Sequence, residues 1–248
     1  MWSAGSRVTD VYLGTRGFAV CESGAPAIAS EVPSFDAMLN RLAQWLTSGA
    51  TTRWPRRRLR LWLSGGLCRP FILPAIEGVE NDAEFRTVAT ALAPQHTGLA
   101  GPCAVLLERV VGHAPMVAVA VQEDQIRSIR DRIDASSRSV RLVSIRPWWA
   151  EVLRHGLVGE PTLTALGVQD CDSLTVLIGK NVGRFDTAAT YSPVMDQSTA
   201  RTVLRRALFS ADVTEGSELF GRLTLRHVAG ADKVAAGMAL SALTEFSR

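Results

Sequence analysis

The fold is decided by Val11–Val20 (VYLGTRGFAV), because a second stretch of the same kind, Val176–Phe185 (VLIGKNVGRF), occurs in the other half of the 248-residue chain. In each stretch an apolar run leads into a turn with glycine, and a second extended run follows. This pattern is typical of a β-hairpin. A unit of this kind that recurs once in each half of a chain indicates an internal duplication. The sequence therefore predicts two similar halves.

Helical and extended patterns alternate between and after these two units. Apolar residues recur with helical spacing in several segments, whereas others are short, rich in Val, Leu and Ile, or strictly alternating. Helices are expected at residues 35–48, with Ser34 as N-cap, at 82–93, ending before Pro94, at 122–136, at 198–208, capped by Ser198 or Thr199, and at the C-terminus, where Val234, Met238, Leu243 and Phe246 share a face. Strands are expected at 58–63, 71–74, 103–111, 116–121, 140–145 and 223–228. This order predicts an α/β fold with mixed sheets flanked by helices.

The glycine turns of the two units are candidate phosphate-binding sites. Backbone N–H groups in such turns can point at an anion, and two facing turns can hold phosphates between two lobes. The candidate binding residues are Gly14, Thr15, Arg16, Gly179, Lys180 and Asn181. A glycine turn in a hairpin also occurs in many proteins that bind nothing, so the plain-turn interpretation stays open.

Phosphate transfer in such a cleft needs carboxylates that hold Mg²⁺ and position water. Two residues before the turn glycines, where a carboxylate is expected, the chain has Tyr12 and Leu177. The nearest acids are Asp10, Asp170, Asp172 and Asp186. Asp10 reaches the cleft only if a β-bulge reorients its strand. The sequence thus predicts a nucleotide-binding architecture without catalytic residues.

Composition and local patterns argue against disulfide-rich, metal-binding and membrane-spanning classes of protein. The net charge is +3, four widely spaced cysteines include no C-x-x-C pair, and the four histidines are scattered. These features favour reduced thiols and argue against a structural metal site. The N-terminus lacks the pattern of a signal peptide, and no stretch has the roughly 18 uncharged apolar residues of a membrane span.

Three further features have a functional and a structural interpretation. The basic run at residues 53–60, beside Trp54 and Trp62, could bind nucleic acid or an anionic membrane, although it is more consistent with a solvated strand face. Ser64-Gly65-Gly66 lacks the context of a nucleophile and is expected to be a plain turn. Trp148 and Trp149 are expected in the core and at its rim, with anchoring of a partner as the alternative.

The order of these elements resembles the actin-like ATPase superfamily, whose two lobes are ribonuclease H-like. The specific segment runs from Met116–Val121 through the helix at 122–136 to Val140–Pro147, preceded by strands at Leu61–Pro74. It is similar to the PilM-type pilus-assembly proteins and to the cytoplasmic domain of GspL-type secretion proteins. The resemblance implies a first lobe at residues 1–160 with an inserted subdomain at about 55–150, and a second lobe at 161–248 with a C-terminal helix. It also places Gly230 in a degenerate adenosine-binding segment.

The resemblance implies a non-catalytic cytoplasmic scaffold, peripheral to the inner membrane of a bacterium, in a type IV pilus or type II secretion-like assembly platform. Its expected partners are an inner-membrane platform protein and a motor ATPase, and homodimer formation is left open. No nucleic acid, metal or cofactor is expected, although ATP binding stays open. The alternative is an active actin-like ATPase or kinase that binds ATP and Mg²⁺ between the lobes.

Overall fold

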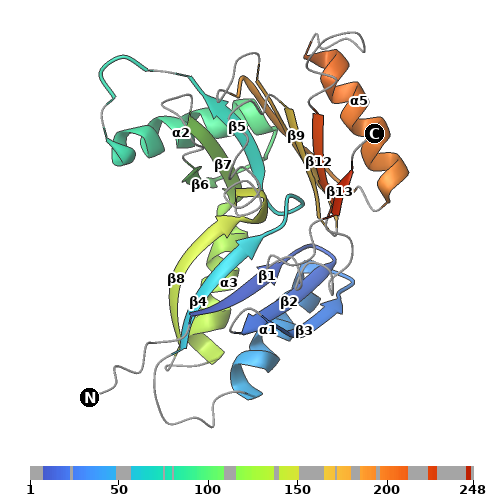
Figure 1. Cartoon of the computed structure of the whole chain (residues 1–248). Helices are drawn as coiled ribbons and strands as arrows, with labels where there is room; N and C mark the ends of the chain where they lie inside the picture. Colours follow the sequence, from blue (N-terminus) through green and yellow to red (C-terminus); the bar gives the residue numbers. More distant parts are fainter. Residues whose placement is uncertain are drawn as a thin grey trace, which may run out of the picture.

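Two five-stranded sheets and one three-stranded sheet contain the strands of the described part of the chain in the computed structural model. Figure 1 shows the first sheet in the lower half of the molecule, the second at the upper right and the third beside the second. The structure describes residues 8–22, 25–48, 57–74, 76–79, 81–108, 116–136, 140–150, 165–170, 172–179, 185–193, 196–211, 223–227 and 244–246.

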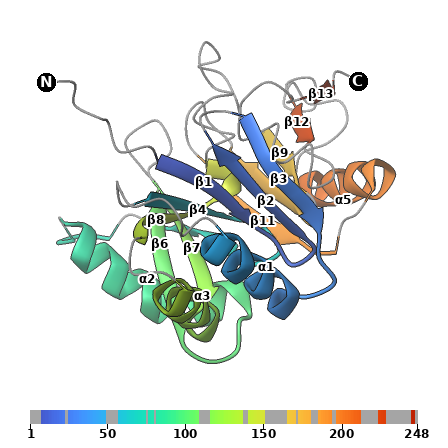
Figure 2. The same ribbon diagram turned by 90° about the horizontal axis from the view of Figure 1, so that it is seen from below.

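The first sheet has the strand order β3-β2-β1-β4-β8, in which β1 is antiparallel to β2 and parallel to β4. Helices α1 and α3 lie side by side on one face of it (Figure 2). The hairpin and both helices predicted in this region are confirmed. The elements are β1 Val8–Leu13, β2 Gly17–Glu22, β3 Ala25–Glu31, α1 Phe35–Ser48, β4 Arg57–Leu63, α3 Glu123–Ser136 and β8 Val140–Pro147.

The second sheet has the order β11-β10-β9-β12-β13. Helix α5 covers one face of it, where Leu204 and Leu208 pack with Val176 and Ile178. On the other face, Val168 and Leu177 join the main core cluster that also holds the first sheet. The two halves therefore share an apolar contact. The elements are β9 Ala165–Gln169, β10 Leu174–Ile178, β11 Thr187–Tyr191, α5 Gln197–Ser210, β12 Leu223–His227 and β13 Thr244–Phe246.

The third sheet, β5-β7-β6, is inserted between the strands of the first sheet. Helix α2 packs on it through Ala89 and Ala93, in a separate core cluster. Both β4 and β8 pair within the first sheet, so the separate sheet and helix occupy only the part of the chain between these two strands. The lobe boundary expected between residues 160 and 161 lies outside the described residues. The elements are β5 Arg69–Leu73, α2 Asp82–Thr97, β6 Cys103–Glu108 and β7 Met116–Gln122.

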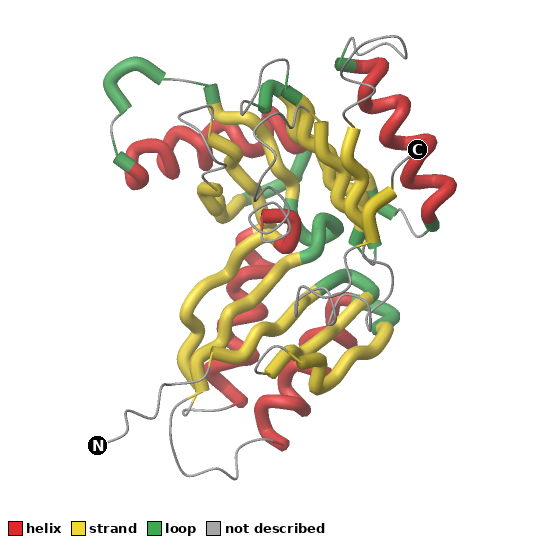
Figure 3. The backbone as a smooth tube through the Cα atoms, in the orientation of Figure 1, coloured by secondary structure: helices red, strands yellow, loops and turns green. Residues whose placement is uncertain are grey.

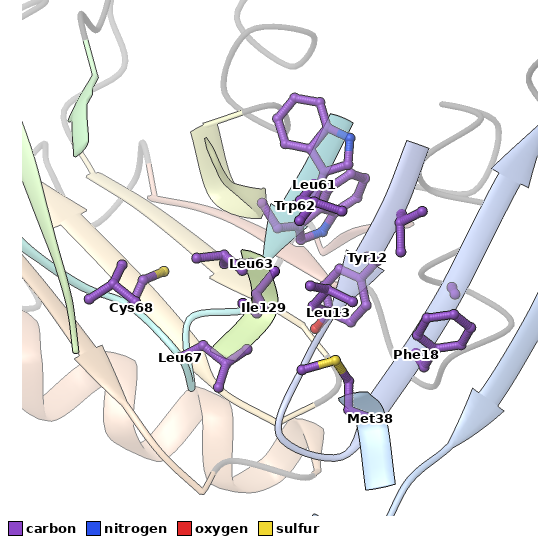
Figure 4. Close-up of a cluster of buried hydrophobic side chains, with 14 of the residues drawn as sticks. Tyr12, Leu13, Phe18, Met38, Leu61, Trp62, Leu63, Leu67, Cys68 and Ile129 are labelled. Atoms are coloured by element: carbon purple, nitrogen blue, oxygen red, sulfur yellow. The ribbon is translucent and has the colours of Figure 1, made fainter. Parts of the chain in front are cut away.

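An aromatic cluster fills the face of the first sheet that is opposite to α1 and α3. Tyr12 and Trp62 are paired across β1 and β4, so their side chains leave the sheet on the same side. The Trp148 ring packs edge-on against both, with centroid distances of 6.1 Å and 6.0 Å. Figure 4 shows Tyr12 and Trp62 among the buried side chains of this core. Trp148 and Trp149 are each 1% exposed, so the interpretation of this pair as a partner anchor is wrong.

Helix α2 corrects one predicted boundary. It continues through Pro94 to Thr97 and ends at Gly98, whose φ of 66° is left-handed and whose N–H donates to the Pro94 carbonyl over 3.0 Å. A proline inside a helix removes one backbone hydrogen bond, but only one turn follows it here, and the glycine cap satisfies a carbonyl at the end of that turn.

The cap of α5 and the C-terminus also differ from expectation. Asp196, rather than Ser198 or Thr199, is the N-cap, and its carboxylate accepts hydrogen bonds from both of those residues. Phe246 lies in β13, which pairs antiparallel with β12, so the predicted C-terminal helix is wrong at that residue. Residues 231–243 of that predicted helix lie outside the described residues. Pairing with β12 determines the structure at Phe246, although the spacing of the apolar residues in the sequence favoured a helix.

None of the helices among the described residues is both long and apolar enough to cross a membrane. Cys68 and Cys103 carry free thiols, in agreement with the expected reduced state. Burial raises the pKa of the Cys68 thiol, so this group is a neutral member of the core.

Candidate functional site: the contact between the two lobes

The internal repeat is real, but its register differs from the one that the sequence indicated. Strand β9 is antiparallel to β10 and parallel to β12, as β1 is antiparallel to β2 and parallel to β4. The counterpart of the β1–β2 turn is therefore the β9–β10 turn, residues 170–173. The predicted second unit, Val176–Phe185, is instead the following pair of strands, β10 and β11, and Gly179 lies at the opposite end of β10 from the 170–173 turn.

The two corresponding turns meet each other. In the first turn, Gly14 N–H donates to the Gly17 carbonyl over 2.7 Å, which leaves the Thr15 N–H pointing out of the hairpin. The Thr15 N–H and hydroxyl donate to Asp172 Oδ2, over 2.7 Å and 2.5 Å. One carboxylate oxygen of the second lobe thus holds the tip of the first-lobe turn.

A second loop of the first lobe completes this contact. Residues 64–68 connect β4 to β5 and lie between the two halves of the molecule (Figure 3). The Ser64 hydroxyl donates to the same Asp172 oxygen over 3.0 Å, and the Gly65 N–H donates to Asp170 Oδ2 over 2.8 Å. The predicted turn is confirmed, because the Leu67 N–H donates to the Ser64 carbonyl over 3.1 Å, but the interlobe contact was not predicted. We call Thr15, Ser64, Gly65, Asp170, Asp172 and Ser173 the interlobe polar cluster.

Close approach of the two lobes requires glycine at two positions of the β4–β5 loop. A Cβ at Gly65 would lie 2.5 Å from Ser173 Oγ and 2.7 Å from Thr175 Oγ1. A Cβ at Gly66 would lie 2.8 Å from Asp172 Oδ1. These distances are shorter than real contacts of a methyl group, so any side chain here would require the contacted side chains of the second lobe or the loop itself to shift.

Burial makes the electrostatics of the cluster unusual. Asp170 is 4% exposed and Asp172 is 1% exposed. Desolvation, followed by the nearby Asp172 carboxylate, raises the pKa of Asp170 well above its usual range, although hydrogen bonds from Ser173 and Gly65 oppose this shift. Asp170 therefore holds its proton to a higher pH than an exposed aspartate does.

This shift predicts a pH dependence of stability. A carboxyl group whose pKa is raised in the folded state stabilises that state fully below its unfolded pKa of about 4, and the stabilisation is lost as the pH rises through the folded pKa. We expect the free energy of unfolding, measured with urea, to fall between pH 4 and the raised pKa. Asp170→Asn should flatten this part of the profile. An unchanged slope in Asp170→Asn would assign the dependence to another group.

The other predicted site residues have different surroundings. Gly14 is buried and the Arg16 side chain is exposed, while Lys180, Asn181 and Gly230 lie outside the described residues. Tyr12 and Leu177, the residues at the expected acid positions, are both fully buried in the core.

The remaining acids do not join the cluster. Asp10 accepts hydrogen bonds from Arg60 Nε, over 2.5 Å, and from Trp62 Nε1, over 2.9 Å. The pairing of β1 is regular from Thr9 to Leu13, so no bulge turns Asp10 toward the other lobe. Asp186 is exposed beyond the far end of β10.

Arg60, the last residue of the basic run at residues 53–60, makes contacts within the protein. Its guanidinium lies 5.1 Å from the centre of the Trp62 ring, in addition to pairing with Asp10. Residues 53–56 lie outside the described residues.

A second feature is a groove of about 640 Å³ between β6 and β8. Among the described strands, β6 pairs only with β7 and β8 only with β4, so each presents an open edge. Apolar side chains of both strands line the groove, together with Arg86 and Arg130. Arg146 and Glu108 form an ion pair across it, with Arg146 Nε donating to Glu108 Oε1 over 2.9 Å. Val143 of β8 is 43% exposed, which is high for an apolar residue in this structure.

The sequence matches no protein-family model and no curated protein. Solved structures match it over nearly its whole length. A Bacteroides thetaiotaomicron protein of unknown function with an actin-like ATPase fold matches with a TM-score of 0.61 at 10% identity, over 97% of this chain and 90% of that one. The chain therefore has the actin-like ATPase fold, which confirms the fold that the resemblance implied.

Two further structures with this fold belong to bacterial assembly systems. The cytoplasmic domain of EpsL, an inner-membrane component of the type II secretion system of Vibrio cholerae, matches with a TM-score of 0.53 at 13% identity, over 97% of each chain. The PilM–PilN type IV pilus biogenesis complex matches with a TM-score of 0.52 at 14% identity, over 95% of this chain and 85% of that one. The chain thus shares its fold with the two kinds of protein that its sequence resembles.

Proposed function

We propose that this protein is a non-catalytic scaffold of a type IV pilus or type II secretion-like assembly platform, on the cytoplasmic side of a bacterial inner membrane. The groove between β6 and β8 carries this proposal, because it offers a binding surface that does not depend on a nucleotide. The shared fold with EpsL and PilM supports the choice of assembly system. A motor ATPase is a further partner in this proposal.

The groove has the chemistry for an extended segment of a membrane-platform partner. An incoming strand can form backbone hydrogen bonds with the open edge of β6 or β8, as in β-strand addition. Ala104, Leu106 and Leu142 supply apolar contacts. Arg86 and Arg130 add positive charge, while the lining acid, Glu108, is already paired with Arg146. The occupant that fits is therefore an extended apolar segment with acidic residues.

The absence of catalysis in this proposal is supported by the interlobe polar cluster. The Thr15 N–H and hydroxyl, which a phosphate would need, are already bonded to Asp172. The carboxylates of the second turn bind first-lobe donors rather than facing an open cleft. An ATP molecule would have to break these contacts before its phosphates could enter.

Co-purification with the platform protein tests the docking site. We expect Val143→Glu to reduce recovery of a co-expressed inner-membrane platform protein of the same host by at least tenfold, because a negative side chain enters the apolar lining and repels the acidic residues of the occupant. Val143 is partly exposed on an edge strand, so stability should change by only about 0.5 kcal/mol.

Phe209→Glu is the matched control, since Phe209 is 54% exposed on α5 of the other lobe and its replacement should not affect recovery. Equal recovery with Val143→Glu would refute docking in the groove. Turnover of ATP and Mg²⁺ by the same preparations should not exceed the buffer rate. Turnover that disappears in Asp170→Asn would instead support the alternative, an active ATPase or kinase.

A further inference from the structure

We propose that the Gly14–Gly17 turn is a functional oxyanion site whose ligand is supplied by the protein itself, the Asp172 carboxylate of the opposite lobe. This inference rests on the non-catalytic part of the proposed function and explains what takes the place of a nucleotide between the lobes. It does not depend on the partner or on the assembly system.

Three hydrogen-bond donors of the first lobe converge on one carboxylate oxygen of the second lobe. A backbone N–H and two hydroxyl groups, from Thr15 and Ser64, meet at the single oxygen Asp172 Oδ2, at 2.5–3.0 Å. Backbone N–H groups in a tight turn, assisted by hydroxyls, are how proteins bind phosphate and carboxylate oxygens. Hydrogen bonds to a carboxylate oxygen are shorter and stronger than those between neutral groups.

Burial of the Asp172 carboxylate between the lobes costs free energy. Asp172 is 1% exposed, and none of the cationic side chains that the structure describes pairs with it. Its other oxygen, Oδ1, is buried with no hydrogen-bond partner in the described part of the chain. A buried carboxylate persists only when other groups compensate its charge. Donors of the first lobe make that compensation, as they would for a bound anion.

Hydrogen bonds within the second lobe hold Asp172 in place. The backbone of Asp172 is held on both sides, because its N–H donates to Asp170 Oδ1 over 3.3 Å and its carbonyl accepts from the Ser192 hydroxyl over 3.2 Å. Asp170 Oδ1 also accepts from the Ser173 hydroxyl over 2.6 Å. Gly66 leaves the space in which Asp172 Oδ1 lies. The carboxylate is therefore a fixed part of the turn.

Removing the internal ligand should vacate a site for an external one. In Asp172→Ala, the Thr15 and Ser64 donors lose their acceptor, and small oxyanions can replace the missing carboxylate. We expect this variant to unfold at a lower temperature than the wild type in sodium chloride. Sodium phosphate or sodium acetate at the same ionic strength should raise its midpoint, by about 5–10 °C when the anion exceeds its dissociation constant 100-fold.

Three other proteins make this experiment decisive. The wild type and Asp172→Asn, in which an amide oxygen keeps the acceptor, should show only the general stabilisation that phosphate gives to folded proteins, which is smaller than the stabilisation of Asp172→Ala. Asp134→Ala removes an exposed carboxylate of α3 and should also show only this general stabilisation. If Asp172→Ala does not fold in chloride, Asp172→Ser takes its place in the same titration.

Two results would overturn the inference. One is an Asp172→Ala or Asp172→Ser variant that responds equally to chloride, phosphate and acetate. The other is a wild type that phosphate stabilises as much as it stabilises the variant. If the anions do not stabilise the variant, the proposal that a partner docks in the groove is not affected. Failure of the scaffold role would instead be detected by co-purification and by ATP turnover in the wild type.

Discussion

Gly65→Ala is expected to weaken the contact between the two lobes and to lower the free energy of unfolding by about 2–4 kcal/mol. The new Cβ would lie 2.5 Å from Ser173 Oγ and 2.7 Å from Thr175 Oγ1, both buried, so either these side chains or the loop must shift. Overpacking of this kind costs about 1–3 kcal/mol. A shift of the loop also breaks the hydrogen bond from Gly65 N–H to Asp170, and a typical intramolecular hydrogen bond contributes about 0.5–1.5 kcal/mol. Urea denaturation measures the total.

Hydrogen exchange distinguishes lobe separation from general destabilisation. The Thr15 N–H is bonded to Asp172 across the interface, so its exchange should accelerate in Gly65→Ala more than that of amides within β1 and β2. Adding Ser173→Ala and Thr175→Ala removes both obstructing hydroxyls and should recover part of the loss. A Gly65→Ala protein that is as stable as the wild type would show that the lobes do not approach as closely as the structure indicates.

Trp148→Ala is expected to lower the free energy of unfolding by about 3–5 kcal/mol, the range for removal of a buried large aromatic side chain. Trp148 is 1% exposed and packs edge-on against Tyr12 and Trp62, so its loss opens a cavity between the first sheet and the helical turn at residues 148–150. The midpoint of the unfolding transition should shift to a lower urea concentration. The slope of the free energy against urea concentration should not change, because unfolding exposes about the same surface area.

Trp148→Phe is the matched control for this prediction. The Trp148 Nε1 is buried without a hydrogen-bond partner among the residues described, so phenylalanine removes an unsatisfied donor while it keeps much of the ring contact. We expect a loss of only about 1–2 kcal/mol. A loss as large as that of Trp148→Ala would mean that the indole N–H is bonded after all.

The sequence predicted the fold through its local patterns. The hairpin at Val11–Val20 and the helices at 35–48 and 122–136 were recognisable because one face of each is apolar with the correct period. The boundary of α2 and the strand at Phe246 were not, because the first depends on a cap geometry at Gly98 and the second on pairing with a distant strand.

The candidate site was predicted only in part. Thr15 was identified from its glycine turn, but the second turn was placed at Gly179, since a glycine is a stronger local signal than the Asp170–Ser173 turn, which contains none. The partner of Thr15 is 157 residues away in the chain, and no local pattern states such a pairing. Ser64-Gly65-Gly66 looked like an ordinary turn because its function depends on the side chains of the other lobe.

The matching strand order of the two sheets has a consequence for how such a scaffold behaves in a cell. The two copies of the repeat have become unlike, because one turn now supplies hydrogen-bond donors and the other supplies their acceptor. Two halves that complete each other need no diffusible third component to stay together. In the proposed scaffold, their spacing would be independent of the ratio of ATP to ADP, and a docked partner would meet the same geometry in a growing cell and in a starved one.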